Sequence, residues 1–163
     1  MIILGIDPGI AIVGYGVLNF EKGKYTVIDY GVITTDKDLK TPERLVLIEK
    51  GLIQLIEKYH PDCVGIEELF FQTNRKTAIV VAEARGVILL TVQKYCKQLF
   101  EYTPLQIKQA VTGYGQADKH QVQFMVKTLL NLKTIPKPDD AADALAAAIT
   151  CAQVNRLNNL FRI

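Results

Sequence analysis

The sequence predicts an α/β fold in which a mixed five-stranded sheet carries helices on both faces. The first three apolar runs have the length of strands and are separated only by short turns. Later apolar runs alternate with segments of helical periodicity, as in units with parallel strands. The 163 residues are enough for one core and too few for two. We therefore expect a single domain over residues 1–154 and a short C-terminal tail, residues 155–163, that frays or is disordered.

The first three strands are predicted to form an antiparallel meander. Residues 2–6 are apolar and end at Asp7-Pro8-Gly9, a sequence typical of a turn. Residues 12–19 and 25–34 follow as two more strands, with Glu21-Lys22-Gly23-Lys24 as the hairpin between them.

A helix and a buried strand come next. Thr41 is expected to cap this helix, and Pro42 fits its first helical position. Residues 63–66 then form a strand that ends at Glu67. The strand, helix, strand order makes this strand a candidate parallel neighbour of residues 2–7.

The remaining elements are one long apolar helix, a fifth strand and three further helices. The expected ranges are 77–95, 100–103, 104–111, 119–130 and 139–154. The first of these helices is apolar around most of its circumference, so it must be covered on most sides. A domain of this size offers little cover, and we expect a subunit interface there. The whole order of elements resembles the ribonuclease H-like fold.

The net charge of +2 hides an uneven distribution. Residues 72–137 hold ten basic and three acidic residues, a net charge of +7, and the remainder of the chain is at −5. A basic half beside an acidic cluster suits a polyanion held against a metal site. Lysines on solvated helix faces would give the same count, so both interpretations stay open.

Other compositional features exclude several classes of protein. The three cysteines are far apart in apolar segments, which indicates buried free thiols rather than disulfides or a zinc site. No apolar run approaches the roughly 20 residues that span a bilayer. We therefore expect a cytoplasmic protein without membrane contact.

Four carboxylates are the candidate site residues, and the first two are Asp7 and Glu67. Both follow predicted strands that are parallel neighbours, and ligands of open α/β sheets bind at the carboxyl ends of the strands. Asp7 could instead bond to its own turn, and a glutamate at a strand end is often simply solvated. Glu68 is expected to point to the opposite face from Glu67.

The other two carboxylates are Asp140 and Asp143. Their i, i+3 spacing places them on one face of the last helix. Asp139 is expected to be the N-terminal cap, a role that also remains open for Asp140. Alanines at most of the surrounding positions let this helix approach the sheet and bring both acids towards Asp7.

Gathering four acids favours a bound cation. At an effective dielectric of about 20, two charges about 4 Å apart repel by about 4 kcal/mol. Oxygen ligands favour Mg²⁺, or alternatively Mn²⁺, over zinc, with one or two ions per subunit. Two ions would activate water and stabilise the departing oxygen of a phosphodiester. Asp7 would then bridge both ions, Glu67 and Asp140 would complete one each, and Asp143 would complete the set or orient the water.

Three sequence motifs carry these acids: Ile6-Asp7-Pro8-Gly9, Ile66-Glu67 and Asp140-Ala141-Ala142-Asp143-Ala144-Leu145. In order and spacing they resemble the motifs of the RuvC Holliday-junction resolvases, the crossover junction endodeoxyribonucleases. The resemblance implies that the four carboxylates are catalytic and bind Mg²⁺. It also implies a homodimer that cuts two opposed strands of a four-way DNA junction symmetrically, in homologous recombination and DNA repair, together with the RuvA and RuvB branch-migration proteins.

Five further residues are expected to contact DNA. Phe70 and Phe71 follow Glu67, so that one ring can stack on an unpaired base, and the resemblance selects Phe70. Lys108 and Lys119 are expected to bind phosphate or stabilise transition-state charge. Arg75 and Lys76 could bind the DNA backbone.

Two alternative functions remain open from the sequence. A related nuclease could cut the RNA strand of hybrid duplexes, or the chain could bind junctions without cutting them. Four carboxylates near phosphate would weaken pure binding, which argues against the second alternative.

Overall fold

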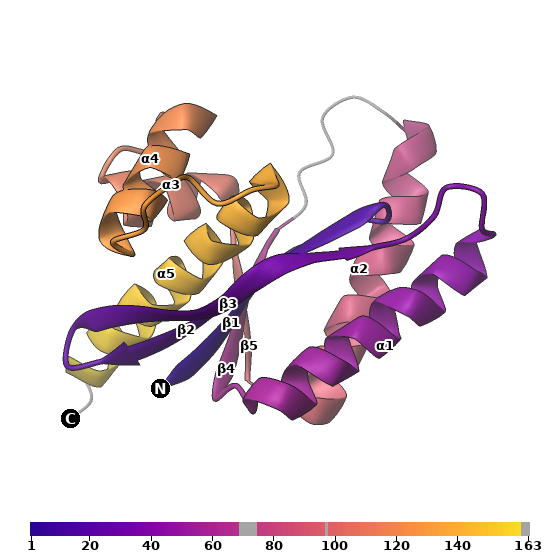
Figure 1. The fold of residues 1–163 in the computed structure, drawn as a ribbon, viewed down its shortest axis with the longest axis horizontal. Coiled ribbons are helices and arrows are strands. Elements are labelled where there is room, and N and C mark those ends of the chain that lie inside the picture. The colour runs from indigo at the N-terminus through magenta and orange to yellow at the C-terminus, as the bar shows by residue number, and fades with distance from the viewer. Residues whose placement is uncertain (69–74, 97, 161–163) are drawn as a thin grey trace.

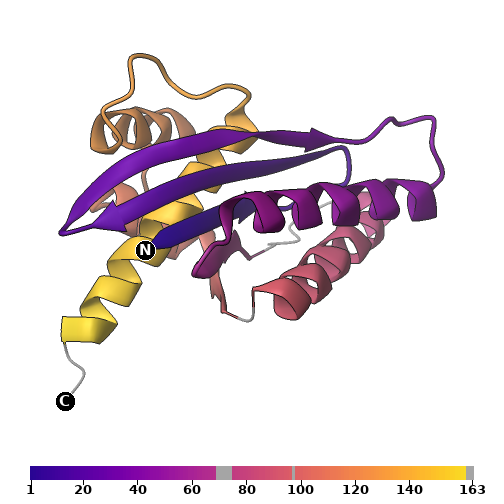
Figure 2. The ribbon, with the colours of Figure 1, turned by 60° about the horizontal axis from the view of Figure 1, so that its bottom comes forward.

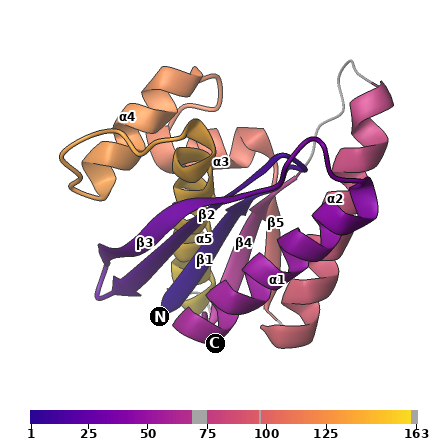
Figure 3. The same cartoon turned by 45° about the vertical axis from the view of Figure 1, so that its right-hand side comes forward.

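The centre of the molecule is a five-stranded sheet with the strand order β3-β2-β1-β4-β5. The structure, a computed structural model, describes residues 1–68, 75–96 and 98–160. The strands are β1 (Ile2–Asp7), β2 (Ile12–Glu21), β3 (Lys24–Thr34), β4 (Cys63–Glu67) and β5 (Leu99–Tyr102). β1, β2 and β3 form an antiparallel meander, and β4 and β5 continue the sheet parallel to β1 (Figure 3). The predicted mixed sheet is therefore confirmed.

Helices cover both faces of this sheet. α1 (Thr41–Tyr59) and α2 (Arg75–Tyr95) lie on one face, and α5 (Asp139–Leu160) lies on the other (Figures 1 and 2). The short helices α3 (Pro104–Thr112) and α4 (Lys119–Leu129) pack against α5. Each face has its own apolar core, because alternate strand residues point to opposite sides.

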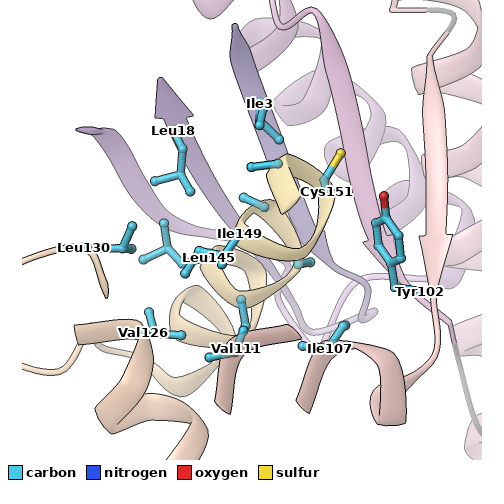
Figure 4. Packing of buried hydrophobic residues seen from close by; sticks show 14 of the residues in the cluster. Ile3, Leu18, Tyr102, Ile107, Val111, Val126, Leu130, Leu145, Ile149 and Cys151 are labelled. Atoms are coloured by element: carbon cyan, nitrogen blue, oxygen red, sulfur yellow. The ribbon is translucent and has the colours of Figure 1, made fainter. Parts of the chain in front are cut away.

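Helix α5 packs unusually close to the sheet. A Cβ added to Gly5 of β1 would lie 1.9 Å from the carbonyl oxygen of Ala144, and one added to Gly14 of β2 would lie 2.0 Å from that of Asp140. Figure 4 shows Leu145 and Ile149 of α5 among the buried side chains of this core. The glycines and alanines therefore allow the first turns of α5 to lie over the ends of β1 and β2.

Several predicted helix boundaries differ from the structure. Thr41 is the first helical residue of α1 and not its cap; the cap is Lys40, whose backbone N–H donates to the Glu43 carboxylate over 2.9 Å. Helix α2 begins at Arg75, two positions before the expected start at 77. Helix α5 continues beyond residue 154 to Leu160, since no proline or glycine interrupts it.

The three cysteines are free thiols, as predicted. Cys63 and Cys151 are buried with their Sγ atoms 3.6 Å apart, whereas Cys96 is only half-buried. Among the described helices, none is both long and apolar enough to cross a membrane.

Candidate active site

Asp7 and Glu67 lie next to each other at one edge of the sheet. Ile6 of β1 is the register partner of Ile66 of β4, so the residues that follow them end two adjacent parallel strands. Glu67 is half-buried and Glu68 is exposed. The predicted pairing of Asp7 with Glu67, and the solvated position of Glu68, are confirmed.

The helix α5 brings Asp140 to the same edge. Asp7 pairs across the β1–β2 ladder with Gly14, and the backbone of Asp140 lies directly over Gly14. Any side chain at position 14 would push α5 away from the sheet. The absence of a side chain at Gly14 therefore positions the first turn of α5 above Asp7.

The four carboxylates form one electrostatic group. Burial, and after it the charges of Asp143, Glu67 and Asp140, together raise the pKa of Asp7 from 3.8 to about 8. Burial and the Asp143 charge also raise the pKa of Glu67. These pKa shifts indicate that the four carboxylate side chains lie near one another, as the sequence predicted. Their negative charges are not fully balanced by cations of the protein.

Lys119, at the start of α4, is the cation closest to Asp143 among the described ion pairs. Its Nζ lies 3.2 Å from Oδ2 of Asp143 and 3.5 Å from Oδ2 of Asp139. Burial lowers the pKa of Lys119, but these two carboxylates raise it by more, so it remains an ammonium ion. The pKa of Asp143 is raised by burial despite the opposing charge of Lys119.

Asp139 does not have the role that was expected of it. It is the first residue of α5 rather than a cap preceding it, and its carboxylate also accepts a hydrogen bond from Lys137 Nζ over 2.8 Å. This bond lowers the pKa of Asp139. The link from Asp139 to Lys119 was missed at the sequence level, because the only available signal was its adjacency to Asp140.

A cavity of about 190 Å³ opens beside these groups. Its lining includes Glu67, Asp143, Lys108 and Lys119. Two lysines predicted to contact DNA thus face the same space as two of the predicted catalytic acids. The cavity can hold an anionic group between ammonium ions and carboxylates, which is the arrangement needed by a phosphodiester that reacts at a cation site.

Comparisons with known proteins show the family of this chain. Residues 3–151 match the family model described as "Crossover junction endodeoxyribonuclease RuvC". The chain belongs to the RuvC family. It is 58% identical to the RuvC of Alkaliphilus oremlandii, with 100% of this chain and 99% of the relative covered.

Solved structures of RuvC proteins have the same ribonuclease H-like fold. Thermus thermophilus RuvC is similar with a TM-score of 0.89 at 35% identity, covering 97% of each chain. The T. thermophilus RuvC in complex with a Holliday junction substrate has a TM-score of 0.91 at 34% identity, covering 97% of this chain and 96% of that one. Membership of the RuvC family makes the chain a metal-dependent crossover junction endodeoxyribonuclease, a phosphodiester hydrolase.

The donors at the site fit the metal that a RuvC nuclease requires. Carboxylate oxygens are the ligands preferred by Mg²⁺ and Mn²⁺, and burial together with the neighbouring carboxylate charges raises the pKa of Asp7. Among the described residues, however, no three His, Cys, Asp or Glu side chains are arranged as a preformed ligand cluster. The four carboxylates lie in one region but do not converge on a single point. The ammonium group of Lys119 forms an ion pair with Oδ2 of Asp143.

Three predicted DNA contacts cannot be placed beside this site. Phe70 lies outside the described residues. Arg75 and Lys76 are the first two residues of α2, and the structure does not describe their side chains.

Proposed function

We propose that this RuvC-family chain resolves four-way DNA junctions by hydrolysing a phosphodiester bond at the cavity beside Glu67 and Asp143. The proposal depends mainly on one observation, the placement of the four carboxylates at one edge of the sheet, where burial and then their mutual charges raise the pKa of Asp7. Such a gathering costs stability unless a cation is bound there. The complex of T. thermophilus RuvC with a Holliday junction supports the choice of substrate.

We assign Asp7, Glu67, Asp140 and Asp143 as the residues that would hold Mg²⁺, with Mn²⁺ as an alternative and one or two ions per subunit. When bound, the metal would supply Lewis-acid activation of water and would neutralise charge on the phosphate. Asp143 would complete the ligand set or orient the attacking water. These roles follow from the oxygen chemistry of the side chains and from their shared environment.

The lysines have a different role in this proposal. The ammonium groups of Lys108 and Lys119 face the cavity, where they can donate hydrogen bonds to non-bridging phosphate oxygens. Charge that develops on those oxygens in the transition state would be stabilised by both donors. Phe70, Arg75 and Lys76 remain predicted DNA contacts.

We further propose a homodimer that pairs through helix α2. Ile79 and Leu90 are 67% and 55% exposed on this helix, although they are apolar. A Cβ added to Gly86 would meet no described heavy atom within 4 Å, so a second helix could approach closely there. A twofold dimer would present two equivalent sites to two opposed strands, which suits symmetric cleavage.

The wider setting is proposed from the family resemblance and from the sequence. The resemblance suggests RuvA and RuvB as the partner proteins. The length and composition of the chain suggest that the work takes place in the cytoplasm and that residues 1–154 act as a single nuclease domain.

The test is to incubate the protein with a synthetic four-way junction and Mg²⁺, beside Asp7→Asn. We expect paired symmetric nicks from the natural chain, and binding without nicks from the variant. Binding without cleavage by both proteins would replace the proposal with a junction-binding module. Cleavage of the RNA strand in a hybrid duplex, with the junction left intact, would indicate a ribonuclease H activity instead.

A further inference from the structure

A second pocket lies on the other side of helix α4 from the active site. It has a volume of about 350 Å³ and is lined by the loop after α3 and by α4, including Tyr114, Ala117, His120, Gln121 and Phe124. None of these residues belongs to the carboxylate site or to the predicted DNA contacts. Tyr114 is 59% exposed and Phe124 is 52% exposed, so two aromatic rings border an open pocket.

The two rings are available to a ligand. Among the described rings, only Phe20 and Tyr25 pack against each other, so Tyr114 and Phe124 do not cover one another's faces. Exposed aromatic rings on a nucleic-acid enzyme are typical platforms for stacking a base. An apolar contact surface for another protein would more commonly be flat, whereas this one is a concave pocket bordered by polar groups.

The wall formed by Tyr114 is held in place by its own loop. Gly113 ends α3 with φ at 75°, and the hydroxyl of Thr112 accepts from the backbone N–H of Tyr114 over 3.0 Å. The N–H of Ala117 then donates to the Tyr114 carbonyl over 3.1 Å. The backbone of this wall is therefore fixed before a ligand arrives, which lowers the ordering cost of binding.

The polar border of the pocket offers a hydrogen-bond donor. The side-chain oxygen of Gln121 accepts from the backbone N–H of Asp118 over 2.9 Å as part of the capping box of α4. Its amide NH₂ has no partner among the described residues and can donate outward. A base presents carbonyl oxygens and ring nitrogens that accept such a bond.

Helix α4 connects the pocket to the active site, and the surrounding region is basic, as DNA binding requires. Lys119 faces the catalytic cavity, while its neighbour His120 faces the second pocket. Along the axis of α4, Phe124 lies about 7.5 Å beyond Lys119 at 1.5 Å per residue, so the pocket is within a few nucleotides of the catalytic cavity. Residues 104–133, which form this part of the fold, contain four lysines and one acidic residue.

We propose that the pocket between Tyr114 and Phe124 is a subsite for an unpaired nucleobase of the DNA strand being cut, a short distance from the scissile phosphate. The inference depends on the proposed junction-cleaving function. It assigns to Phe124 and Tyr114 a part in substrate selection, because a base must leave its pair to enter the pocket and weakly paired sequences do so at lower cost.

The test measures binding to four-way junctions in an Asp7→Asn background, so that cleavage does not deplete the substrate. Single abasic sites are placed in turn at each of the nucleotides flanking the cut position. We compare Phe124→Ala, Tyr114→Ala and the conservative Phe124→Tyr with Leu47→Ala, which removes a half-exposed leucine from α1 on the opposite face of the sheet.

The unchanged pocket should lose about 5- to 150-fold in affinity at one abasic position, the equivalent of one stacked base. Phe124→Ala and Tyr114→Ala should weaken binding of the intact junction and abolish the additional loss at that position, whereas Phe124→Tyr and Leu47→Ala should keep it. Equal abasic profiles for Phe124→Ala and Leu47→Ala would overturn the subsite while leaving the proposed function intact. Failure of the natural chain to cut any junction would instead overturn the proposed function.

Discussion

The ammonium of Lys119 lies 3.2 Å from Oδ2 of Asp143, which joins the first turn of α4 to α5 inside the catalytic cavity. The same lysine is 3.5 Å from Asp139, so one cation serves two carboxylates. This cation offsets part of the charge that the four acids accumulate. A phosphate or a metal entering the site must therefore compete with an existing ion pair.

Lys119→Met should separate these two effects. Removal of the ammonium should lower the rate of junction cleavage at saturating Mg²⁺ by about 10²–10³-fold, the usual loss for one transition-state donor. The site also becomes more negative, so Mg²⁺ should bind roughly tenfold or more tightly. Single-turnover cleavage and Mg²⁺ titration measure the two quantities. Lys133→Met, which removes an exposed lysine from the same basic region, is the control and should change neither.

Asp7 makes the stability of the metal-free protein depend on pH. Because the folded-state pKa is about 8 and the ordinary value is 3.8, the folded state holds this proton more tightly. The resulting stability is fully present below pH 3.8 and is lost as pH rises through about 8. Asp7→Asn cannot lose a proton, so it should be the more stable protein at pH 9, by at most about 6 kcal/mol.

Urea unfolding in the presence of a chelator, at a series of pH values, measures this difference. Adding Mg²⁺ at pH 9 should restore stability to the natural chain and have much less effect on Asp7→Asn. Parallel pH profiles for the two proteins would contradict the raised pKa of Asp7.

Gly14→Ala should damage both the fold and the site. The new methyl group would lie 2.0 Å from the carbonyl oxygen of Asp140, so α5 must move away from β2. Overpacking of this kind costs about 1–3 kcal/mol, and the thermal midpoint should fall by about 2–12 °C. Gly51→Ala on α1 is the comparison and should lower the midpoint less, because a Cβ there meets only side-chain atoms of Ile33, which can shift. A Gly14→Ala protein with an unchanged midpoint and full cleavage would contradict the close approach of α5.

Leu90→Asp should disrupt the proposed dimer. Leu90 is 55% exposed on α2, and a buried aspartate without a partner at a subunit interface is strongly unfavourable. Sedimentation velocity at micromolar concentration should show a monomer, and junction cleavage should change from paired to single nicks. Leu47→Asp, on α1, provides the control for a charge at an exposed leucine. A natural chain that sediments as a stable monomer would remove the basis for this prediction.

The sequence by itself determined the meander of the first three strands and the pairing of Asp7 with Glu67. Short turns leave a meander little choice of partner, and a strand, helix, strand unit returns its second strand parallel to the first. Helical spacing likewise placed Asp140 and Asp143 on one face. These features depend on local periodicity and on connection rules, which sequence patterns record directly.

Only the tertiary structure decided how close the acids lie, which cation meets them and where the second pocket forms. The contact of Asp140 with Gly14, the pairing of Lys119 with Asp143 and Asp139, and the pKa of Asp7 all depend on distances between segments far apart in the chain. Burial and charge separation depend on those distances rather than on local residue spacing, so no motif in a single segment could reveal them.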